Sequence, residues 1–279
     1  MQIITTKKAL QQALSLHREN CRTVGLVPTM GALHEGHASL IRRCVAENDV
    51  SVVSVFVNPT QFNNKEDLEK YPRNLNRDAE LLSSLSVDFV FSPAPEEMYS
   101  PEEMQQRFEF DFAGLDKVME GKMRPGHFNG VVQVVSKLFR LTMPDKAYFG
   151  EKDYQQLAII RRMVEVMHFN VDIVGCPIVR EESGLALSSR NERLSPEEKL
   201  TAVNISRVLH ESLLYSQSHT VRETEQWVMT EINAVKGLEV EYYEIVDQTT
   251  LQPAAGFSHA IGCVTVYCGP VRLIDNIKY

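Results

Sequence analysis

The sequence has no apolar run that approaches the roughly 20 residues needed to cross a bilayer. Its first residues carry neither the apolar core of a secretory signal nor a lipidation motif. The five cysteines are an odd number without Cys-x-x-Cys spacing, so we expect neither a disulfide framework nor structural zinc. These absences predict a chain with reduced thiols and no membrane partner that works in the cytoplasm.

Positive charge is also scarce, because 29 Lys and Arg residues stand against 37 Asp and Glu residues, a net charge of −8. That balance argues against a nucleic-acid partner, which needs a broad basic face, although it leaves room for a local basic pocket. The phosphate loop Gly-x-x-x-x-Gly-Lys, the dinucleotide fingerprint Gly-x-Gly-x-x-Gly and the serine-nucleophile elbow Gly-x-Ser-x-Gly are all missing. Nucleophilic catalysis by a Ser-His-Asp triad therefore has no support in the sequence.

Strand-like and helix-like segments alternate through the first part of the chain. Apolar and β-branched runs predict strands at residues 24–27, 50–57, 87–91, 147–149 and 171–174. Apolar residues at helical spacing predict helices at residues 10–16, 37–47, 78–85, 131–141 and 155–167. Such alternation predicts an α/β fold, a Rossmann-like doubly wound parallel sheet that binds its ligands beyond the carboxyl ends of the strands.

The pattern changes near residue 176. Two long helical patterns follow, at residues 197–214 and 221–235, and two strand patterns come after them, at residues 239–246 and 260–268. Helices followed by strands predict a smaller α+β domain hinged over the first. We place the domains at residues 1–176 and 177–279.

Two histidines stand at the start of a predicted helix. The strand before them stops at Pro28, the chain turns at Gly31, and His34 and His37 come three residues apart, so both imidazoles lie on one helix face. Unpaired N–H groups and a positive dipole make a helix start a natural phosphate site. Gly36 leaves the backbone open to a nucleotide. The pattern favours a nucleotide site over surface histidines or metal ligands.

Two loops carry polar side chains suited to a small ligand. Asn58 and Gln61 follow an apolar strand beside Phe62 and could bind a small polar substrate with an apolar side, although Asn-Pro alone is ordinary turn chemistry. The glycine-rich loop Arg124-Pro-Gly-His-Phe-Asn-Gly130 holds one arginine and one histidine. It could close on an anion or simply precede the next helix, and the sequence leaves both readings open.

Lys152 and Asp153 follow a strand and a turn at Gly150, where another helix begins. Lys152 could reach a phosphate as a point charge, and Asp153 could help to hold Mg²⁺. The alternative is an acidic first turn that complements the helix dipole beside a solvated lysine.

The segment Leu185-Ala-Leu-Ser-Ser-Arg-Asn191 lies at the predicted domain junction. Two hydroxyls and a guanidinium can grip a triphosphate, and the loop could fold over the nucleotide when it binds. The alternative is a serine-rich surface loop, and it would be preferred if the two histidines were absent.

Together these motifs resemble the pantothenate synthetase (pantoate–β-alanine ligase) family. Six linked motifs carry the resemblance in order along the chain: Pro28-Thr-Met-Gly31, His34-Glu-Gly-His37, Val57-Asn-Pro-Thr-Gln-Phe62, Arg124-Pro-Gly-His-Phe128, Phe149-Gly-Glu-Lys-Asp-Tyr-Gln-Gln156 and Leu187-Ser-Ser-Arg-Asn191. The terminal Arg272-Leu-Ile-Asp-Asn276 also fits, so the resemblance covers essentially the whole chain. Glu35 and Leu187 replace the more frequent Asp and Met, and neither change removes a group that the chemistry needs.

The family is similar to nucleotidyltransferases that share the His-x-Gly-His signature with class I aminoacyl-tRNA synthetases, whose Lys-Met-Ser-Lys-Ser loop corresponds to Leu187-Ser-Ser-Arg190. The resemblance implies a two-step ligation with ATP as a substrate, Mg²⁺ as a cofactor and a homodimeric enzyme. Pantoate carboxylate attacks the α-phosphorus of ATP to give pantoyl adenylate and pyrophosphate, and the amine of β-alanine then releases pantothenate and AMP. Such chemistry asks mainly for positioning and charge neutralisation, so no covalent catalyst is needed.

The resemblance also implies roles for individual residues. His34 and His37 contact the phosphates and stabilise the transition state, with His37 a possible proton donor, and they form the catalytic set with Lys152 and Arg190. The remaining residues expected along ATP are Met30, Gly31, Gly150, Asp153, Val179, Leu187, Ser188 and Ser189, with Asp153 near the ribose or Mg²⁺. The expected pantoate and β-alanine pocket consists of Asn58, Gln61, Gln156, Tyr71 and Arg124.

Two other functions compete with this interpretation. A nucleotidyltransferase that joins a nucleotide to another small acid or a phosphorylated acceptor would need no amine. A non-catalytic RNA-binding relative of the synthetases would need the basic aromatic surface that this acidic chain does not offer.

Overall fold

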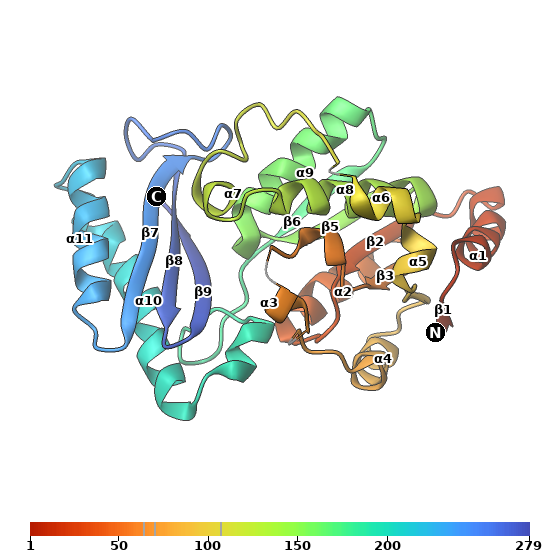
Figure 1. The fold of residues 1–279 in the computed structure, drawn as a ribbon, viewed down its shortest axis with the longest axis horizontal. Helices are drawn as coiled ribbons and strands as arrows, with labels where there is room; N and C mark the ends of the chain where they lie inside the picture. Colours follow the sequence, from red (N-terminus) through yellow and green to blue (C-terminus); the bar gives the residue numbers. More distant parts are fainter. Residues whose placement is uncertain (64, 70, 107) are drawn as a thin grey trace.

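The computed structural model describes residues 1–63, 65–69, 71–106 and 108–279. A six-stranded parallel sheet forms one half of the molecule and a three-stranded antiparallel sheet the other (Figure 1). This arrangement confirms the α/β fold with a smaller α+β unit that the sequence predicts.

All six strands of the large sheet run parallel in the order β1-β4-β3-β2-β5-β6. Their bounds are β1 (Gln2–Ile4), β2 (Val24–Thr29), β3 (Val50–Val55), β4 (Phe89–Phe91), β5 (Lys146–Gly150) and β6 (Asp172–Cys176). From β2 the chain passes to β3 on one side and returns to β5 on the other. The strand order therefore reverses at β2, which is where ligands bind in open α/β sheets.

Apolar side chains from helices cover both faces of the large sheet. Leu10, Leu14 and Leu138 belong to one apolar cluster with the sheet, to which α1, α8 and α9 contribute. Ile41 and Leu82 belong to the cluster on the other face, supplied by α2 and α4. These helices are α1 (Lys7–Glu19), α2 (Glu35–Glu47), α4 (Leu75–Ser84), α8 (His127–Thr142) and α9 (Tyr154–Met167).

Shorter helical segments lie in the connections. They are η1 (Pro59–Gln61), α3 (Lys65–Glu69), α5 (Pro95–Met98), α6 (Pro101–Gln105), α7 (Met119–Met123), η2 (Glu151–Asp153) and η3 (Ser189–Arg193). They are not predicted from the sequence, since each is too short to show a helical period.

The second half consists of α10 (Pro196–Tyr215) and α11 (Val221–Asn233), packed on the antiparallel strands β7 (Leu238–Asp247), β8 (Ala260–Cys268) and β9 (Val271–Lys278). Its own cluster includes Val208, Val228 and Val266. Other side chains of the small sheet, among them Val246 and Ile261, pack into the cluster of the large sheet instead. The two halves therefore share apolar contacts.

Two strands are missing from the sequence prediction. β1 is only three residues long, and β9 lacks a clean alternation because Asp275 and Asn276 are both buried. The strand expected to stop at Pro28 in fact runs to Thr29, with Pro28 paired in register with Ser54. Among the described residues, no helix is long and apolar enough to cross a membrane.

A glycine lets α8 approach the η1 turn. A Cβ at Gly130 would lie 2.4 Å from the carbonyl oxygen of Thr60 and 2.7 Å from the Cα of Gln61, so any larger residue would push against backbone. A Cβ at Gly256, by contrast, would meet nothing within 4 Å.

We expect Gly130→Ala to lower the free energy of unfolding by about 1–2 kcal/mol, because overpacking against backbone outweighs the gain of Ala in a helix. Urea unfolding measures the change. Gly256→Ala is the control and should stay within about 0.5 kcal/mol of the parent. Equal stability of the Gly130→Ala protein would contradict the close approach.

Candidate active site

The site lies at the carboxyl ends of the two strands where the sheet order reverses. β2 leads through a turn to His34 at the start of α2, and the neighbouring β5 leads into η2, which carries Lys152 just before α9. Because the two strands are parallel neighbours, their outgoing loops meet at one edge. Lys152 is close enough to lower the pKa of both His34 and His37.

The two histidines cap the start of α2. The Nδ1 atom of His34 accepts the backbone N–H of Gly36 at 3.1 Å, and the Nδ1 atom of His37 accepts the backbone N–H of His34 at 3.3 Å. Since Nδ1 is an acceptor in both rings, the neutral rings carry their proton on Nε2. The ring centroids are 4.1 Å apart, and both rings line the same cavity.

Both imidazoles are neutral in the free protein at pH 7. Burial, together with the Lys152 ammonium, lowers the pKa of His34 from 6.5 to about 4. Burial, then His34 and then Lys152 lower the pKa of His37 to about 3. At neutral pH the pair therefore donates hydrogen bonds at a helix start through its N–H groups, and neither ring carries the extra proton of an imidazolium that could act as an acid.

The turn before His34 is held from α4. Buried Asp78 accepts the backbone N–H groups of Ala32 at 3.0 Å and Leu33 at 2.8 Å. Gly31 has a φ of +79°, and a Cβ there would lie 2.9 Å from the carboxylate of Asp78. Gly31 thus serves the turn and does not line the cavity. At Gly36 a Cβ would press on the His34 ring, at 2.8 Å.

Asn58 and Gln61 form one hydrogen-bonded unit. The amide of buried Asn58 donates to the Gln61 side-chain oxygen and to the Gly130 carbonyl, both at 3.1 Å. Its oxygen accepts the hydroxyl of Tyr99 at 2.8 Å. The Gln61 amide nitrogen lies 2.9 Å from the Met30 sulfur. Asn58 thereby fixes which end of the Gln61 amide points into the cavity.

The turn that carries Lys152 is held by the small sheet. The side-chain amide of Asn276, on β9, donates to the carbonyl oxygens of Glu151 at 2.9 Å and Lys152 at 3.0 Å. Lys278 pairs with the carboxylate of Glu151 at 2.8 Å. The antiparallel sheet thus contributes directly to the geometry of the site.

The junction loop folds back on itself beside the histidines. The Leu187 N–H donates to the carbonyl of Val179 at 3.0 Å, and the Ser188 hydroxyl caps η3 by accepting the N–H of Arg190 at 3.3 Å. On the same loop, Arg180 makes a two-pronged ion pair with buried Asp275 of β9, at 2.7 and 2.9 Å. The strand β9 of the small sheet therefore holds the loop.

One cavity of about 230 Å³ collects most of the predicted site residues. Its lining includes Met30, His34, His37, Asn58, Gln61, Tyr71, Gly150, Lys152, Asp153, Gln156, Val179, Leu187, Ser188, Ser189 and Arg190. Gly31 and Arg124 lie outside that lining. An apolar wall from α8 is not predicted from the sequence, because its side chains also fit an ordinary helix core. It consists of Val131, Val134, Val135 and Leu138.

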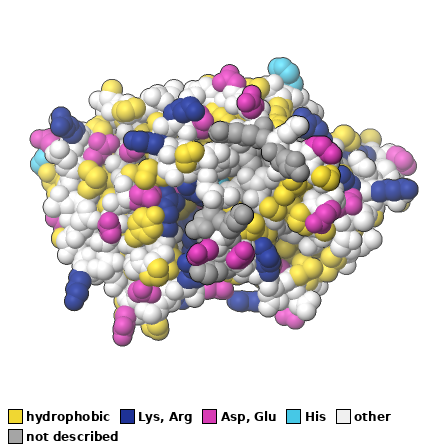
Figure 2. Space-filling view, in the orientation of Figure 1, with side chains coloured by type: hydrophobic (Ala, Val, Ile, Leu, Met, Phe, Trp, Pro, Cys, Tyr) yellow, Lys and Arg dark blue, Asp and Glu magenta, His cyan; other side chains and the backbone are white. Residues whose placement is uncertain are grey.

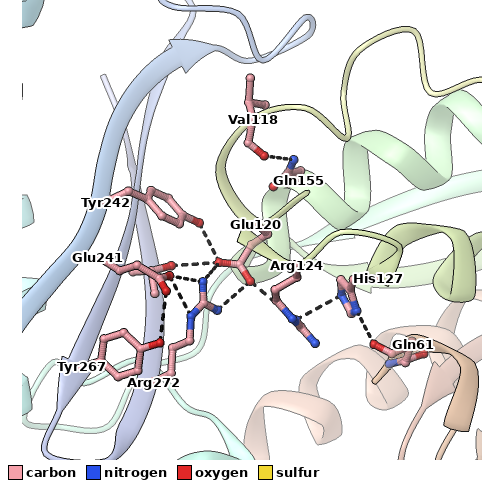
Figure 3. Close-up of polar contacts among 11 residues, drawn as sticks. Gln61, Val118, Glu120, Arg124, His127, Gln155, Glu241, Tyr242, Tyr267 and Arg272 are labelled. Carbon is pink, nitrogen blue, oxygen red and sulfur yellow. Dashed lines mark hydrogen bonds and ion pairs between the residues drawn. The ribbon is translucent and has the colours of Figure 1, made fainter. Parts of the chain in front are cut away.

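Arg124 faces an adjoining pocket and a buried ionic cluster. It lies 3.6 Å from Glu120 and 3.3 Å from His127 (Figure 3). The groove beside it is also lined by Arg190, Arg193 and Arg272. Figure 2 shows Lys and Arg side chains gathered near the middle of this face, between the two halves. This local basic region lies in an acidic chain and suits an anionic ligand.

Asp153 is a candidate ligand for a metal ion in the cavity. The described residues contain no group of three or more His, Cys, Asp and Glu side chains that would hold a metal without help. Asp153 is the acidic side chain among those that line the cavity. Mg²⁺ is commonly held by one or two carboxylates together with substrate phosphates, so these residues fit a magnesium ion that arrives with a nucleotide.

Comparisons with known proteins agree on one family. A family model described as pantoate-beta-alanine ligase matches residues 2–278. The chain is 59% identical to the pantothenate synthetase of Phocaeicola vulgatus and 54% identical to that of Porphyromonas gingivalis, and in both cases the match covers 100% of this chain and 99% of the relative.

Solved structures show the same similarity. The crystal structure of pantothenate synthetase from Thermus thermophilus matches with a TM-score of 0.92 at 44% identity, over 100% of this chain and 99% of that one. A pantoate-beta-alanine ligase from Francisella tularensis, complexed with beta-gamma ATP and beta-alanine, matches with a TM-score of 0.83 at 37% identity, over 100% and 97%.

The neutral histidines predict a loss of stability in mild acid. In the folded chain the pKa values of His34, His37 and His127 are about 4, 3 and 4, below the ordinary 6.5 that the unfolded chain keeps. The unfolded chain therefore binds more protons below pH 6.5, so the stabilisation is complete above that pH and is lost as the pH falls toward 4.

We expect each such ring to lower the free energy of unfolding by about 2 kcal/mol between pH 7 and pH 5. Urea unfolding at pH 7, 6 and 5 measures the total. His127→Asn removes one titrating ring and should flatten the pH dependence. An unchanged slope in that variant would show that His127 is not held neutral by the fold.

Proposed function

The chain belongs to the pantoate–β-alanine ligase family, and from that premise we propose how its own side chains perform the reaction. The chain is an ATP-dependent ligase that joins pantoate and β-alanine to give pantothenate, AMP and pyrophosphate. The observation that carries the residue assignments is the meeting of His34, His37, Lys152 and Gln61 in one cavity at the reversal point of the sheet.

ATP lies with its phosphates at the start of α2. The N–H groups of the first helical turn, the positive end of the helix dipole and the Nε2–H groups of His34 and His37 face its phosphate oxygens. Lys152 and Arg190 neutralise charge, and the hydroxyls of Ser188 and Ser189 donate to the phosphates. The nucleoside part of ATP extends past Met30 and Val179, next to Gly150 and Leu187.

Pantoate lies against Gln61 and Gln156, which bind its hydroxyls and carboxylate. Asn58 acts through Gln61, because both of its amide hydrogens already have acceptors within the protein. The apolar wall of α8 fits the two methyl groups of pantoate. Tyr71 also lines this cavity, while Arg124 lines the adjoining pocket.

The first step forms a bond between a pantoate carboxylate oxygen and the α-phosphorus of ATP and breaks the bond to the bridging oxygen, which leaves with pyrophosphate. Neutral imidazole donors stabilise the charge that develops on the α-phosphate, where an acid is not required. In the second step the β-alanine amine attacks the acyl carbon, the bond from that carbon to the oxygen bound to phosphorus breaks, and AMP leaves with this oxygen. The other carboxylate oxygen stays as the amide carbonyl, and the amine proton passes to solvent.

Asp153 would hold Mg²⁺, and the ion would supply charge neutralisation at the phosphates when bound. From the family resemblance we further propose a homodimer that works in the cytoplasm, and we propose that residues 177–279 form a domain that closes over the ATP site of residues 1–176.

The test of this function is ATP–pyrophosphate exchange in the presence of Mg²⁺, with and without pantoate, followed by AMP release on adding β-alanine. Exchange that depends on pantoate, with AMP accumulating only once β-alanine is present, is the expected result. Exchange supported by another acid, with none from pantoate, would keep the nucleotidyltransferase fold and overturn the substrate assignment.

His37→Ala should lower kcat by about 10²–10³-fold, the usual effect of removing one transition-state donor. His37→Gln is the matched control, because its amide N–H can take the place of Nε2–H and should recover part of the rate. Steady-state rates at saturating substrates decide the point. A His37→Ala enzyme with the parent's kcat would remove His37 from the mechanism.

A further inference from the structure

The backbone of the proposed pantoate pocket is held by a buried histidine. The Nδ1 atom of His127, at the start of α8, lies 2.8 Å from the carbonyl oxygen of Gln61 (Figure 3). His127 is only 8% exposed and lies outside the ATP and pantoate contacts proposed above. His127 thus contacts the backbone of Gln61, the residue whose side-chain amide faces the cavity.

The two neighbours of His127 select one tautomer. A carbonyl oxygen can only accept, so the proton must be on Nδ1, and Nε2 is then the acceptor for the Arg124 guanidinium at 3.3 Å. Burial, then the positive charge of Arg124, lowers the pKa of His127 to about 4. The ring is neutral at pH 7, and Arg124 together with Gln61 fixes which nitrogen carries the proton.

Arg124 is in turn placed by Glu120 of α7. The Glu120 carboxylate receives a two-pronged contact from Arg272 of β9, at 2.8 and 2.6 Å, and a hydrogen bond from the hydroxyl of Tyr242 at 2.8 Å. Although burial opposes ionisation, the Arg272 contacts lower the pKa of Glu120 to about 2, so its charge is permanent at neutral pH.

This series of side-chain contacts ends in the small sheet. The Nε atom of Arg272 donates to Glu241 of β7 at 2.9 Å, and Glu241 also accepts the hydroxyl of Tyr267 at 3.2 Å. Figure 3 shows these side chains extending in sequence from the small sheet, past Glu120 and Arg124, to His127 and Gln61. Two arginines and two glutamates balance their charges within a largely buried row.

We propose that His127 is a positioning residue for the pantoate pocket, and that Glu120 and Arg272 of the neighbouring elements keep it in the tautomer that holds Gln61. The inference rests on the proposed role of Gln61 in binding pantoate. We infer that pantoate affinity depends on the row of charged side chains formed by Arg124, Glu120, Arg272 and Glu241, which reaches into the antiparallel sheet. These side chains need not touch pantoate. ATP, bound at α2 and Lys152, is not sensitive to this row.

The test compares two amide replacements of the same ring. The side-chain N–H of His127→Asn falls where Nδ1–H was and can still donate to the Gln61 carbonyl, whereas the amide of His127→Gln falls where Nε2 was. We expect His127→Gln to raise the KM for pantoate about tenfold, the effect of one lost hydrogen bond, while the KM for ATP stays within about twofold. His127→Asn should restore most of the pantoate affinity.

Gln61→Ala is the reference for the pocket itself. If Gln61→Ala raises the KM for pantoate but His127→Gln and His127→Asn both match the parent, the positioning role is overturned and the proposed function stands. If Gln61→Ala leaves the KM for pantoate unchanged, the pocket assignment fails and takes the positioning role with it. If both His127 variants raise the KM for pantoate and the KM for ATP equally, His127 has only a general structural role.

A double-mutant cycle tests the far end of the row. Glu120→Gln removes the charge that places Arg124 but keeps the shape, and it should also raise the KM for pantoate selectively. When it is combined with His127→Gln, the effects should be less than additive, because both act on the same contact. Full additivity would show that Glu120 does not act through His127.

Discussion

The start of α2 is the feature on which the rest of the site depends. The reaction must bring two anions, a carboxylate and a triphosphate, within bonding distance, and the helix start offers donors where that negative charge gathers. His34 and His37 cap the helix through Nδ1 and therefore present Nε2–H to the cavity. Burial keeps both rings neutral, so they can donate hydrogen bonds without adding charge that the protein would have to compensate. Net positive charge is left to Lys152 and Arg190.

The small sheet completes this arrangement through one strand. Three polar residues of β9 each hold a different piece of the site: Arg272 reaches Glu120 and the His127 row, Asp275 holds Arg180 of the junction loop, and Asn276 holds the carbonyls of the Lys152 turn. Burying such groups is costly unless each finds a partner, and here each does. The second half of the molecule is thus part of the framework that holds the site.

The sequence predicts which loops form the site better than it predicts the distant residues that hold those loops in place. The helix start at His34, the turn at Gly150 and the loop at Ser188 can be recognised because their chemistry lies within a few consecutive residues, and the alternation of strands and helices brings them to one edge. The supports cannot be recognised in this way. Asp78 holds a turn 46 positions earlier in the chain, and Asn276 holds a turn 124 positions earlier.

The strand β9 is missed for the same reason. Asp275 and Asn276 are both buried although neighbouring residues of a strand point to opposite faces, so the sequence lacks the apolar alternation that marks a strand, and only the folded chain supplies their partners. Likewise Asn58, which is predicted beside the substrate, lines the cavity, and the fold adds a contact with Gln61 that the sequence does not reveal.

The most direct test of this mechanism follows pantoate carrying ¹⁸O in both carboxylate oxygens through one turnover. Direct attack on the α-phosphorus predicts one labelled oxygen in AMP and one in the amide carbonyl of pantothenate. Label in pyrophosphate, or none in AMP, would contradict it.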